Sequence, residues 1–451
     1  MTTQAIAAII LAAGKGTRMK SDLHKVLHPI AGRPMLLHLA HSVAALSPAA
    51  TVVVTGAGRE QVEAAVAPLG IATALQAEQL GTGHAVAQAQ AALDGFSGDV
   101  LILYGDVPLV TSATMRRMLD RLQANDSPAT VVLGFRPADP GAYGRVIADA
   151  DGRITKMVEY KDASEAERAE TLCNSGLMAV RSADLFALLA RVGNDNAAGE
   201  YYLPDIVMLA AADGRGSAVI ETAAGEVAGV NSRAELAAVE GDWQAARRMQ
   251  AMADGATLIA PDTVWFAHDT VIGRDVVIEP NVVFGPGVTV ADRVVIHAFS
   301  HIEGATVGTG AEVGPFARLR PGAVMGRDSK VGNFVEMKKA VLGDGAKASH
   351  LSYLGDADIG AGANIGAGTI TCNYDGYFKY RTKIGAGAFI GSNSALVAPV
   401  SIGAGAIVGA GSVVTTDVAD DALALVRPPQ TARDGWAAQF RARMAARKAA
   451  K

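Results

Sequence analysis

The chain has 451 residues, 50% of them hydrophobic, with 50 glycines and a formal net charge of −5. A length beyond ~250–300 residues predicts more than one core, and the negative balance argues against a general nucleic-acid binder. Cys173 and Cys372 cannot build a disulfide framework, and no apolar stretch is long enough to span a bilayer, so we expect a cytoplasmic protein that binds neither nucleic acid nor membrane.

The first predicted element is an apolar strand at 6–11, which leads into a Gly-rich turn at 11–19 (LAAGKGTRM). No basic residue precedes it, which argues against a signal peptide. Glycines let backbone N–H groups approach phosphates, and Arg18 and Lys25 add positive charge. The turn is not a Walker A loop, because the second Gly-Lys-Ser/Thr element is missing, and it is not a dinucleotide fingerprint, because Met19 stands where the third glycine would be. It indicates a triphosphate cradle, although a structural turn would look similar.

Strands and helices then alternate, which predicts a doubly wound, Rossmann-like α/β domain with its site at the strand C-termini. Asp106 directly follows an apolar strand, and a carboxylate there can hold Mg²⁺. Turn chemistry alone would also favour an Asp in the sequence GDVP. Strands are expected at 51–55, 100–104 and 129–135, and helices at 35–46 and 60–69.

A helical period runs from 234 to 254, long enough (~30 Å) to form a rigid strut between two domains. Residues 232–235 (SRAE) fit a capping box, and Gly255 suits the end of the helix. We therefore divide the chain into an N-terminal domain at 1–233, a helical linker at 234–254 and a C-terminal domain at 255–451. The apolar side of the helix is expected to carry Leu236, Val239, Trp243, Ala246 and Met249.

In the C-terminal domain an aliphatic residue returns at every sixth position, often followed by glycine. The phases run from Ile272 to Ile302, from Val307 to Met337 and from Ile384 to Val414. This period fits neither a helix nor a hairpin ladder, and it predicts a left-handed parallel β-helix. Residues 371–383 interrupt the repeat with aromatic and basic side chains, and such insertions usually project on a functional face.

The motifs at 11–19, at Lys25, at 79–85 (QLGTGHA) and at 104–109 (YGDVPL) resemble those of sugar-1-phosphate nucleotidyltransferases. Joined to the six-residue repeat, residues 5–430 resemble the bacterial bifunctional N-acetylglucosamine-1-phosphate uridyltransferase/glucosamine-1-phosphate N-acetyltransferase family. The resemblance implies acetyl transfer from acetyl-CoA to glucosamine-1-phosphate, then uridylyl transfer from UTP to N-acetylglucosamine-1-phosphate. The product, UDP-N-acetylglucosamine, would supply peptidoglycan and lipopolysaccharide synthesis. The resemblance also implies Mg²⁺ as cofactor and a homotrimer.

By the same resemblance, Arg18 and Lys25 act in uridylyl transfer, while Asp106 and Asn231 hold Mg²⁺. Without it, Gly144 and Asn174 would pass for turn residues and Glu159 for an exposed strand residue. The implied nucleotide- and sugar-binding set is Leu11, Ala12, Ala13, Gly14, Lys25, Gln76, Gly81, Thr82, Tyr104, Gly105, Asp106, Gly144, Glu159, Asn174 and Asn231.

His350 is the implied general base of acetyl transfer, since imidazole changes charge near neutral pH. A lone histidine is more often structural, but basic and aromatic residues on nearby coils favour a site in a groove between neighbouring prisms. The implied sugar-phosphate ligands are Arg320, Lys338, Tyr353 and Asn364. The implied acetyl-CoA contacts are Ala367, Asn373, Tyr374, Ser392, Ala410 and Arg427.

Two other functions are compatible with the same domains. One is a nucleotidyltransferase whose β-helix serves only for oligomerisation or regulation, which the presence of His350, Arg320, Lys338 and Tyr353 disfavours. The other is a non-catalytic assembly subunit, which an intact Arg18, Lys25 and Asp106 disfavour. The basic tail after Pro429 is expected to end in a solvated or frayed terminus over its last ten residues.

Overall fold

The structure is a computed structural model that describes residues 4–450. It divides into two compact units, Met1–Arg247 and Arg248–Lys451. Within residues 4–450, no helix combines the length and the apolar character needed to cross a membrane.

The N-terminal unit is built on a mixed sheet whose main path is β11-β7-β10-β6-β1-β4-β5. β1 runs parallel to both β4 and β6, and β5 and β11 extend the sheet in parallel at its two ends. β10 runs antiparallel between β6 and β7, and the hairpin of β8 and β9 pairs with it. The strands are β1 (Ile6–Ala12), β4 (Ala50–Thr55), β5 (Ala72–Leu75), β6 (Asp99–Tyr104), β7 (Thr130–Phe135), β8 (Arg145–Ala148), β9 (Ile154–Val158), β10 (Cys173–Arg181) and β11 (Ala218–Thr222).

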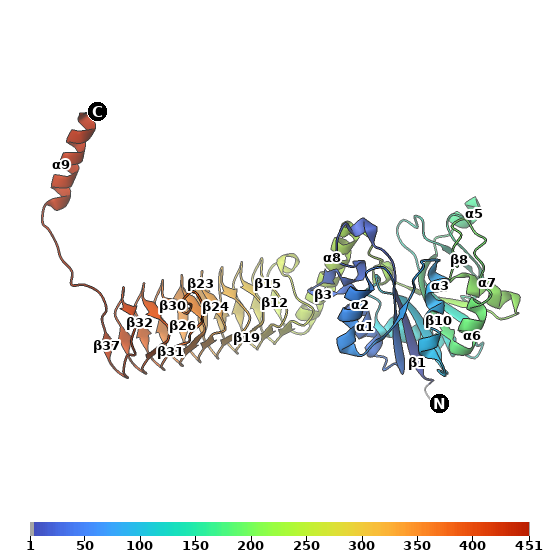
Figure 1. The fold of residues 1–451 in the computed structure, drawn as a ribbon, viewed down its shortest axis with the longest axis horizontal. Helices are drawn as coiled ribbons and strands as arrows, with labels where there is room; N and C mark the ends of the chain where they lie inside the picture. Colours follow the sequence, from blue (N-terminus) through green and yellow to red (C-terminus); the bar gives the residue numbers. More distant parts are fainter. Residues whose placement is uncertain (1–3, 451) are drawn as a thin grey trace. The chain divides into compact units, whose positions relative to one another are not determined.

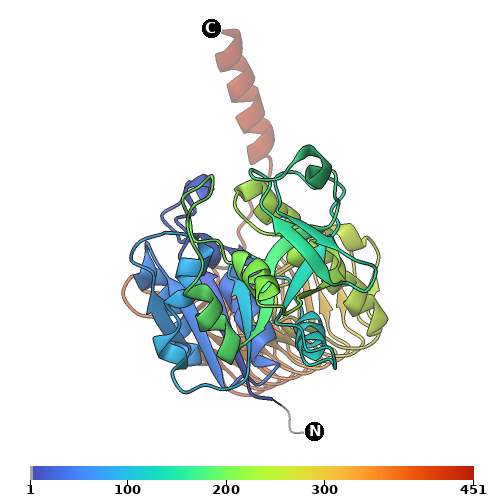
Figure 2. The same cartoon turned by 90° about the vertical axis from the view of Figure 1, so that its right-hand side faces the viewer.

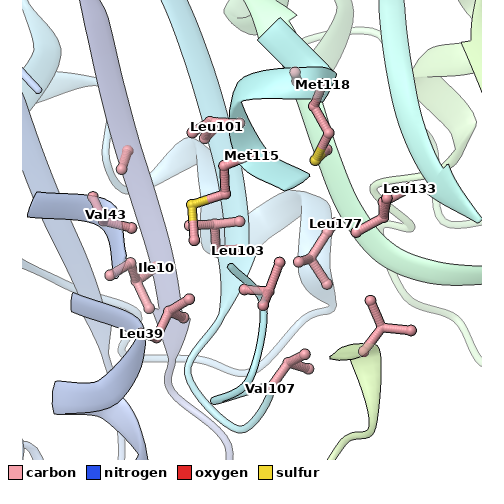
Figure 3. Packing of buried hydrophobic residues seen from close by; sticks show 14 of the residues in the cluster. Ile10, Leu39, Val43, Leu101, Leu103, Val107, Met115, Met118, Leu133 and Leu177 are labelled. Carbon is pink, nitrogen blue, oxygen red and sulfur yellow. The ribbon is translucent and has the colours of Figure 1, made fainter. Parts of the chain in front are cut away.

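Helices cover both faces of this sheet (Figure 2). Alternate strand residues point to opposite faces, so Ile10 and Leu103 belong to one buried cluster and Ile9 and Ile102 to another. Figure 3 shows the first cluster, where Met115 packs beside Leu103. The helices on that face are α1 (Met35–Ala44), α2 (Arg59–Val66) and α4 (Ser112–Leu122), and those on the other are α3 (Thr82–Ala87), α6 (Ser182–Leu189) and α7 (Asp205–Ala212).

The strands and helices predicted along the first 135 residues are confirmed to within a few residues at their ends as β1, β4, β6, β7, α1 and α2. The antiparallel strand β10 was not predicted. Only residues 177–180 form an apolar run in it, and the preceding Asn174-Ser175-Gly176 has the composition of a turn. Because that short run is buried on both faces, nothing local indicates the direction of the strand.

The helix α8 (Arg233–Ala253) confirms the predicted helical segment, and its two ends are held by specific contacts. Ser232 Oγ accepts a hydrogen bond from Glu235 N at 3.3 Å, as expected for a cap. The Glu235 carboxylate accepts from Asn231 N at 2.6 Å instead of from Ser232 N, so the predicted box is displaced by one residue. Gly255, at φ +104°, ends the helix in a Schellman motif as predicted. Val239 is buried, whereas Met249 is 65% exposed and does not extend the apolar side.

The C-terminal unit contains a left-handed parallel β-helix of three stacked sheets (Figure 1). Ile278 lies beside Ile296, eighteen residues later, and Phe284 beside Ile302, so three hexads make one coil. These inward side chains are buried, which confirms the six-residue prediction. One sheet runs from β12 (Thr257–Leu258) to β37 (Leu423–Ala424), another from β13 (Val271–Ile272) to β34 (Val400–Ile402), and the third from β15 (Val283–Phe284) to β36 (Val413–Val414).

The repeat is interrupted as predicted, between β30 (Ile370–Cys372) and β31 (Thr382–Ile384), where Tyr377 and Phe378 are strongly exposed. The last residues were expected to be solvated or frayed. Residues 442–450 are almost all exposed, which fits a solvated terminus, but they are not frayed, because α9 (Trp436–Ala449) is helical. Its alanine, arginine and lysine residues are strong helix formers.

Candidate active sites

The first candidate site is a pocket of about 360 Å³ where β1 and β6 end. Gly105 N donates to Leu11 O at 2.9 Å, so the turn after β6 lies directly on the end of β1. Ten lining residues were predicted, and Val26, Gln79, Ala85 and Glu200 were not. The predicted residues that line it are Leu11, Ala12, Ala13, Gly14, Lys25, Gln76, Gly81, Thr82, Tyr104 and Asp106, with Asn231 reaching it through Lys25.

Lys25, Asp106 and Asn231 form one connected group, although 206 residues separate the first from the last. Lys25 Nζ donates to Asp106 Oδ2 at 2.5 Å and to Asn231 Oδ1 at 3.0 Å. Val230 N donates to Asp106 O at 2.9 Å, which brings the segment before α8 against the turn after β6. A carboxylate and an amide oxygen aimed at one cation are a donor pair that also suits Mg²⁺.

A second pocket, of about 300 Å³, holds the predicted sugar-binding residues Gly144, Glu159 and Asn174. A Cβ on Gly144 would lie 3.2 Å from Glu159 Oε1, so glycine lets this carboxylate approach the backbone. Burial raises the pKa of Glu159, and the nearby carboxylates of Asp205 and Asp162 raise it further. Glu159 lies one residue beyond β9 instead of within a strand.

Tyr104 connects the two pockets. It lines the first, and its ring packs against Gly176, where a Cβ would lie 2.8 Å from the ring. Gly176 belongs to the bulge of β10 that also positions Asn174, whose Oδ1 accepts from Gly176 N at 2.8 Å. Asn174 therefore sits in a bulged strand and not in a simple turn.

Two residues of this region depart from the sequence analysis. Arg18 is exposed in a short 3₁₀ turn (Thr17–Met19) and lies outside both sets of lining residues. Gln79 was not singled out, yet it lines the first pocket and its side-chain amide donates to Ala13 O. The motif at 79–85, which begins with Gln79, is the sequence signal that could have identified this residue.

The second candidate site lies on the β-helix, where His350 ends β26 (Lys347–His350). His350 Nδ1 lies 2.5 Å from Asn333 Oδ1, its in-register neighbour on β23 (Lys330–Asn333). An amide oxygen only accepts, so the proton is on Nδ1 and Nε2 carries the free lone pair. His350 is exposed and lines a groove of about 460 Å³ with His297, Lys330 and Lys347. A base with an oriented imidazole is therefore available there.

Gly332 fixes the spacing of these two strands. A Cβ on Gly332 would lie 1.9 Å from Ser349 O, a backbone atom that cannot move aside. We expect Gly332→Ala to lower the free energy of unfolding by ~1–3 kcal/mol through overpacking and to reduce acetyl transfer by displacing His350. Denaturant unfolding and assays of both activities check this. Gly216→Ala, which meets no atom within 4 Å, is the control, and a wild-type stability for Gly332→Ala would contradict the prediction.

The predicted sugar-phosphate residues gather on the neighbouring sheet. Arg320 Nη1 lies 2.7 Å from Glu336 Oε1, and Glu336 is the in-register neighbour of Tyr353. The Lys379 ammonium, with Arg320 and Lys339 nearby, lowers the pKa of Lys338, so positive charge is concentrated here. Arg320, Lys338 and Tyr353 lie outside the set of residues that line the His350 groove, and Asn364 pairs with Lys347 on the sheet of His350. A single chain therefore presents His350 in one groove, and the basic group of Arg320 and Lys338 outside that groove.

The predicted acetyl-CoA residues fall into two groups. Asn373 lies beside Tyr353, because the space over Gly355 is shared by the Tyr353 hydroxyl and Asn373 Nδ2. Tyr374 follows it in the projecting loop and is 59% exposed. The others follow one corner of successive coils: Asn393 N donates to Ala367 O, Gly411 N to Ser392 O, and Arg427 Nη1 to Ala410 O.

Comparison with known families assigns a model to each unit. A MobA-like NTP transferase domain matches residues 8–255, which include the first two pockets. The bacterial transferase hexapeptide (six repeats) matches residues 269–304 and 381–416 of the β-helix.

Curated relatives match over nearly the whole length. The "Bifunctional protein GlmU" of Rhizorhabdus wittichii is 71% identical over 451 residues, covering 100% of both chains. That of Sphingopyxis alaskensis is 70% identical, covering 99% of this chain and 98% of the relative. That of Rhodospirillum rubrum is 62% identical, covering 97% and 98%. This chain therefore belongs to the GlmU family of bifunctional transferases, in which an NTP-transferase domain precedes hexapeptide transferase repeats.

Proposed function

We propose that the pocket of Lys25 and Asp106 carries uridylyl transfer and that the His350 groove carries acetyl transfer. The chain is a bifunctional enzyme of UDP-N-acetylglucosamine synthesis, which acetylates glucosamine-1-phosphate and then joins the product to UTP. The observation that supports this division best is the contact of Lys25 with both Asp106 and Asn231, inside the region that matches an NTP transferase. An assay of the purified protein with glucosamine-1-phosphate, acetyl-CoA, UTP and Mg²⁺, following CoA and pyrophosphate separately, tests it. Release of only one of the two products would contradict it.

In uridylyl transfer, an oxygen of the sugar phosphate forms a bond to the α-phosphorus of UTP, and the bond to the β-phosphate oxygen breaks. The chain supplies no nucleophile, so its contribution is positioning and neutralisation of charge. Backbone N–H groups at 11–14 and the ammonium of Lys25 face the triphosphate. Gln76, Gly81 and Thr82 contact the base. Glu159 and Asn174 contact the sugar, and Tyr104 lies between sugar and nucleotide. Arg18 is exposed, and we place its guanidinium on the outgoing phosphates.

A divalent metal is consistent with a nucleotidyltransferase of this family, and we assign it as Mg²⁺ held by Asp106 and Asn231. In residues 4–450, no three His, Cys, Asp or Glu side chains gather as a metal site, so the amide of Asn231 and the substrate phosphates must complete the ligand set. When bound, Mg²⁺ neutralises phosphate charge. Glu235 supports Asn231 by accepting its backbone N–H.

In acetyl transfer, His350 Nε2 removes the proton from the amine of glucosamine-1-phosphate as the amine attacks the thioester carbon of acetyl-CoA. The C–S bond then breaks, and CoA leaves as its thiol after accepting a proton. Asn333 holds the proton on Nδ1, so that Nε2 faces the substrate. Arg320 and Lys338 bind the sugar phosphate, Tyr353 and Asn364 the sugar ring. Asn373, Tyr374, Ala367, Ser392, Ala410 and Arg427 line the acetyl-CoA path.

A homotrimer would bring these two groups together, with His350 of one chain facing the basic group of another. Exposed rings support such packing: Phe299, Phe316 and Phe334 stack at 5.0 and 5.2 Å along one corner, and Leu351 follows directly after His350. Exposed apolar ridges of this kind mark interfaces. We expect sedimentation to give three times the chain mass at working concentration, as closed cyclic symmetry favours. A monomer with full acetyl-transfer activity would refute the arrangement.

A further inference from the structure

Lys25 contacts one carboxylate oxygen of Asp106 and the amide oxygen of Asn231, the two residues to which the metal is assigned above. Its Nζ lies 2.5 Å from Asp106 Oδ2 and 3.0 Å from Asn231 Oδ1, and the Lys25 and Asp106 side chains are only 13% and 17% exposed. A dication and an ammonium cannot share this oxygen pair, because they repel each other and need the same space. We infer that Lys25 holds the place of the metal ion until the nucleotide binds. The inference rests on the proposed metal site and adds a role for Lys25 before catalysis.

The surroundings of Lys25 limit how it can leave. The backbone at Lys25–Leu27 is a 3₁₀ turn whose start is capped by His24, and Val26 and Leu27 are buried. A Cβ on Gly16 would lie 2.6 Å from Lys25 Cβ, so the Gly-rich turn packs on the lysine stem. The ammonium therefore leaves Asp106 by rotation of the side chain within the pocket that Lys25 and Gly14 both line.

A triphosphate in that pocket offers the ammonium new anionic partners. Once Lys25 moves to the phosphates, Asp106 and Asn231 are open to the metal, and phosphate oxygens of the nucleotide would complete its ligands. Nucleotide and metal then bind cooperatively. Before nucleotide arrives, the apparent metal affinity is reduced by the fraction of molecules in which Lys25 covers the site. Charge-assisted hydrogen bonds to a mostly buried carboxylate make that fraction large.

The test measures Mn²⁺ binding by calorimetry, with and without a UTP analogue whose α–β bridge cannot be cleaved. Without the analogue, Lys25→Met should bind Mn²⁺ ~10-fold more tightly than the wild type. Arg116→Met, which removes an exposed positive charge on α4, should bind like the wild type. With saturating analogue, the advantage of Lys25→Met should disappear. Lys25→Gln should also bind Mn²⁺ more tightly than the wild type without the analogue. Agreement between the two variants would show that the result does not come from misfolding of one of them.

Equal or weaker Mn²⁺ binding by Lys25→Met without nucleotide would overturn the inference. So would an advantage that persists with the analogue, because it would reflect plain charge repulsion. Asp106→Ala separates this failure from failure of the proposed metal site. If Asp106→Ala loses Mn²⁺ while Lys25→Met gains nothing, only the role of Lys25 is wrong. If Asp106→Ala still binds Mn²⁺, the assigned site and the inference both fail.

Discussion

Asp106→Ala should lower pyrophosphate release by at least ~10²-fold while CoA release continues at the wild-type rate. The change removes a carboxylate from the assigned metal site and one of the two partners of Lys25. Loss of one preorganised electrostatic group commonly lowers kcat by ~10²–10³. The two activities belong to different units, so coupling between them should be small. Separate assays of the two products, with circular dichroism to verify folding, measure the effect.

Asp126→Ala is the matched control, because that exposed carboxylate pairs with Arg121 on the same unit and lies outside both pockets. It should leave both activities unchanged. Loss of both activities in a folded Asp106→Ala protein would show that the sites are not independent. Retained pyrophosphate release would exclude Asp106 from the metal site.

His350→Ala should lower kcat for acetyl transfer by ~10²–10⁴, the usual contribution of a general base. The exposed side chain makes one side-chain hydrogen bond, to Asn333, so its removal should change stability little. Uridylyl transfer should be unaffected, since His350 lies in the other unit. The measurement is kcat for acetyl transfer by the variant and the wild type across a range of pH.

His301→Ala controls for removal of an exposed histidine from the same β-helix, and it should keep the wild-type profile. If His350 were only a corner residue, the variant would melt earlier and keep its turnover. A near wild-type kcat across this range would assign the base to another group.

The β-helix was the most predictable part of the fold, because its determinant is local. Each hexad places one aliphatic side chain inward, and Ile278, Phe284 and Ile296 lie where the period put them. The parallel strands β1 and β6 were predictable for a similar reason, since their apolar runs end at recognisable turns. The antiparallel direction of β10 was not predictable, because a strand that is buried on both faces shows no alternation of apolar and polar residues.

The residues of the candidate sites could be predicted only where a sequence motif marks them. Asp106 could be placed by its turn, but nothing local indicates that Lys25 and Asn231 would meet there from opposite ends of the unit. The partner of Glu235 is Asn231 N, one residue before the expected one, in a loop that is also held by the bond from Val230 N to Asp106 O. Glu159 and Asn174 have no local signature at all, since their position depends on a hairpin and a bulge.

The eighteen-residue coil has a consequence for how the C-terminal unit folds. Parallel sheets usually form slowly, because their strands are far apart in sequence. Here the in-register neighbour of Ile278 is Ile296, eighteen residues later, and that of Val313 is Val331. Even across the insertion the spacing is only 25 residues, as between Asn364 and Phe389, so each new strand closes a short loop. Growth can proceed from any nucleated coil in either direction, as in a one-dimensional zipper. Chain synthesis can therefore add one coil at a time to a stack that is already ordered, without waiting for the C-terminus to be made.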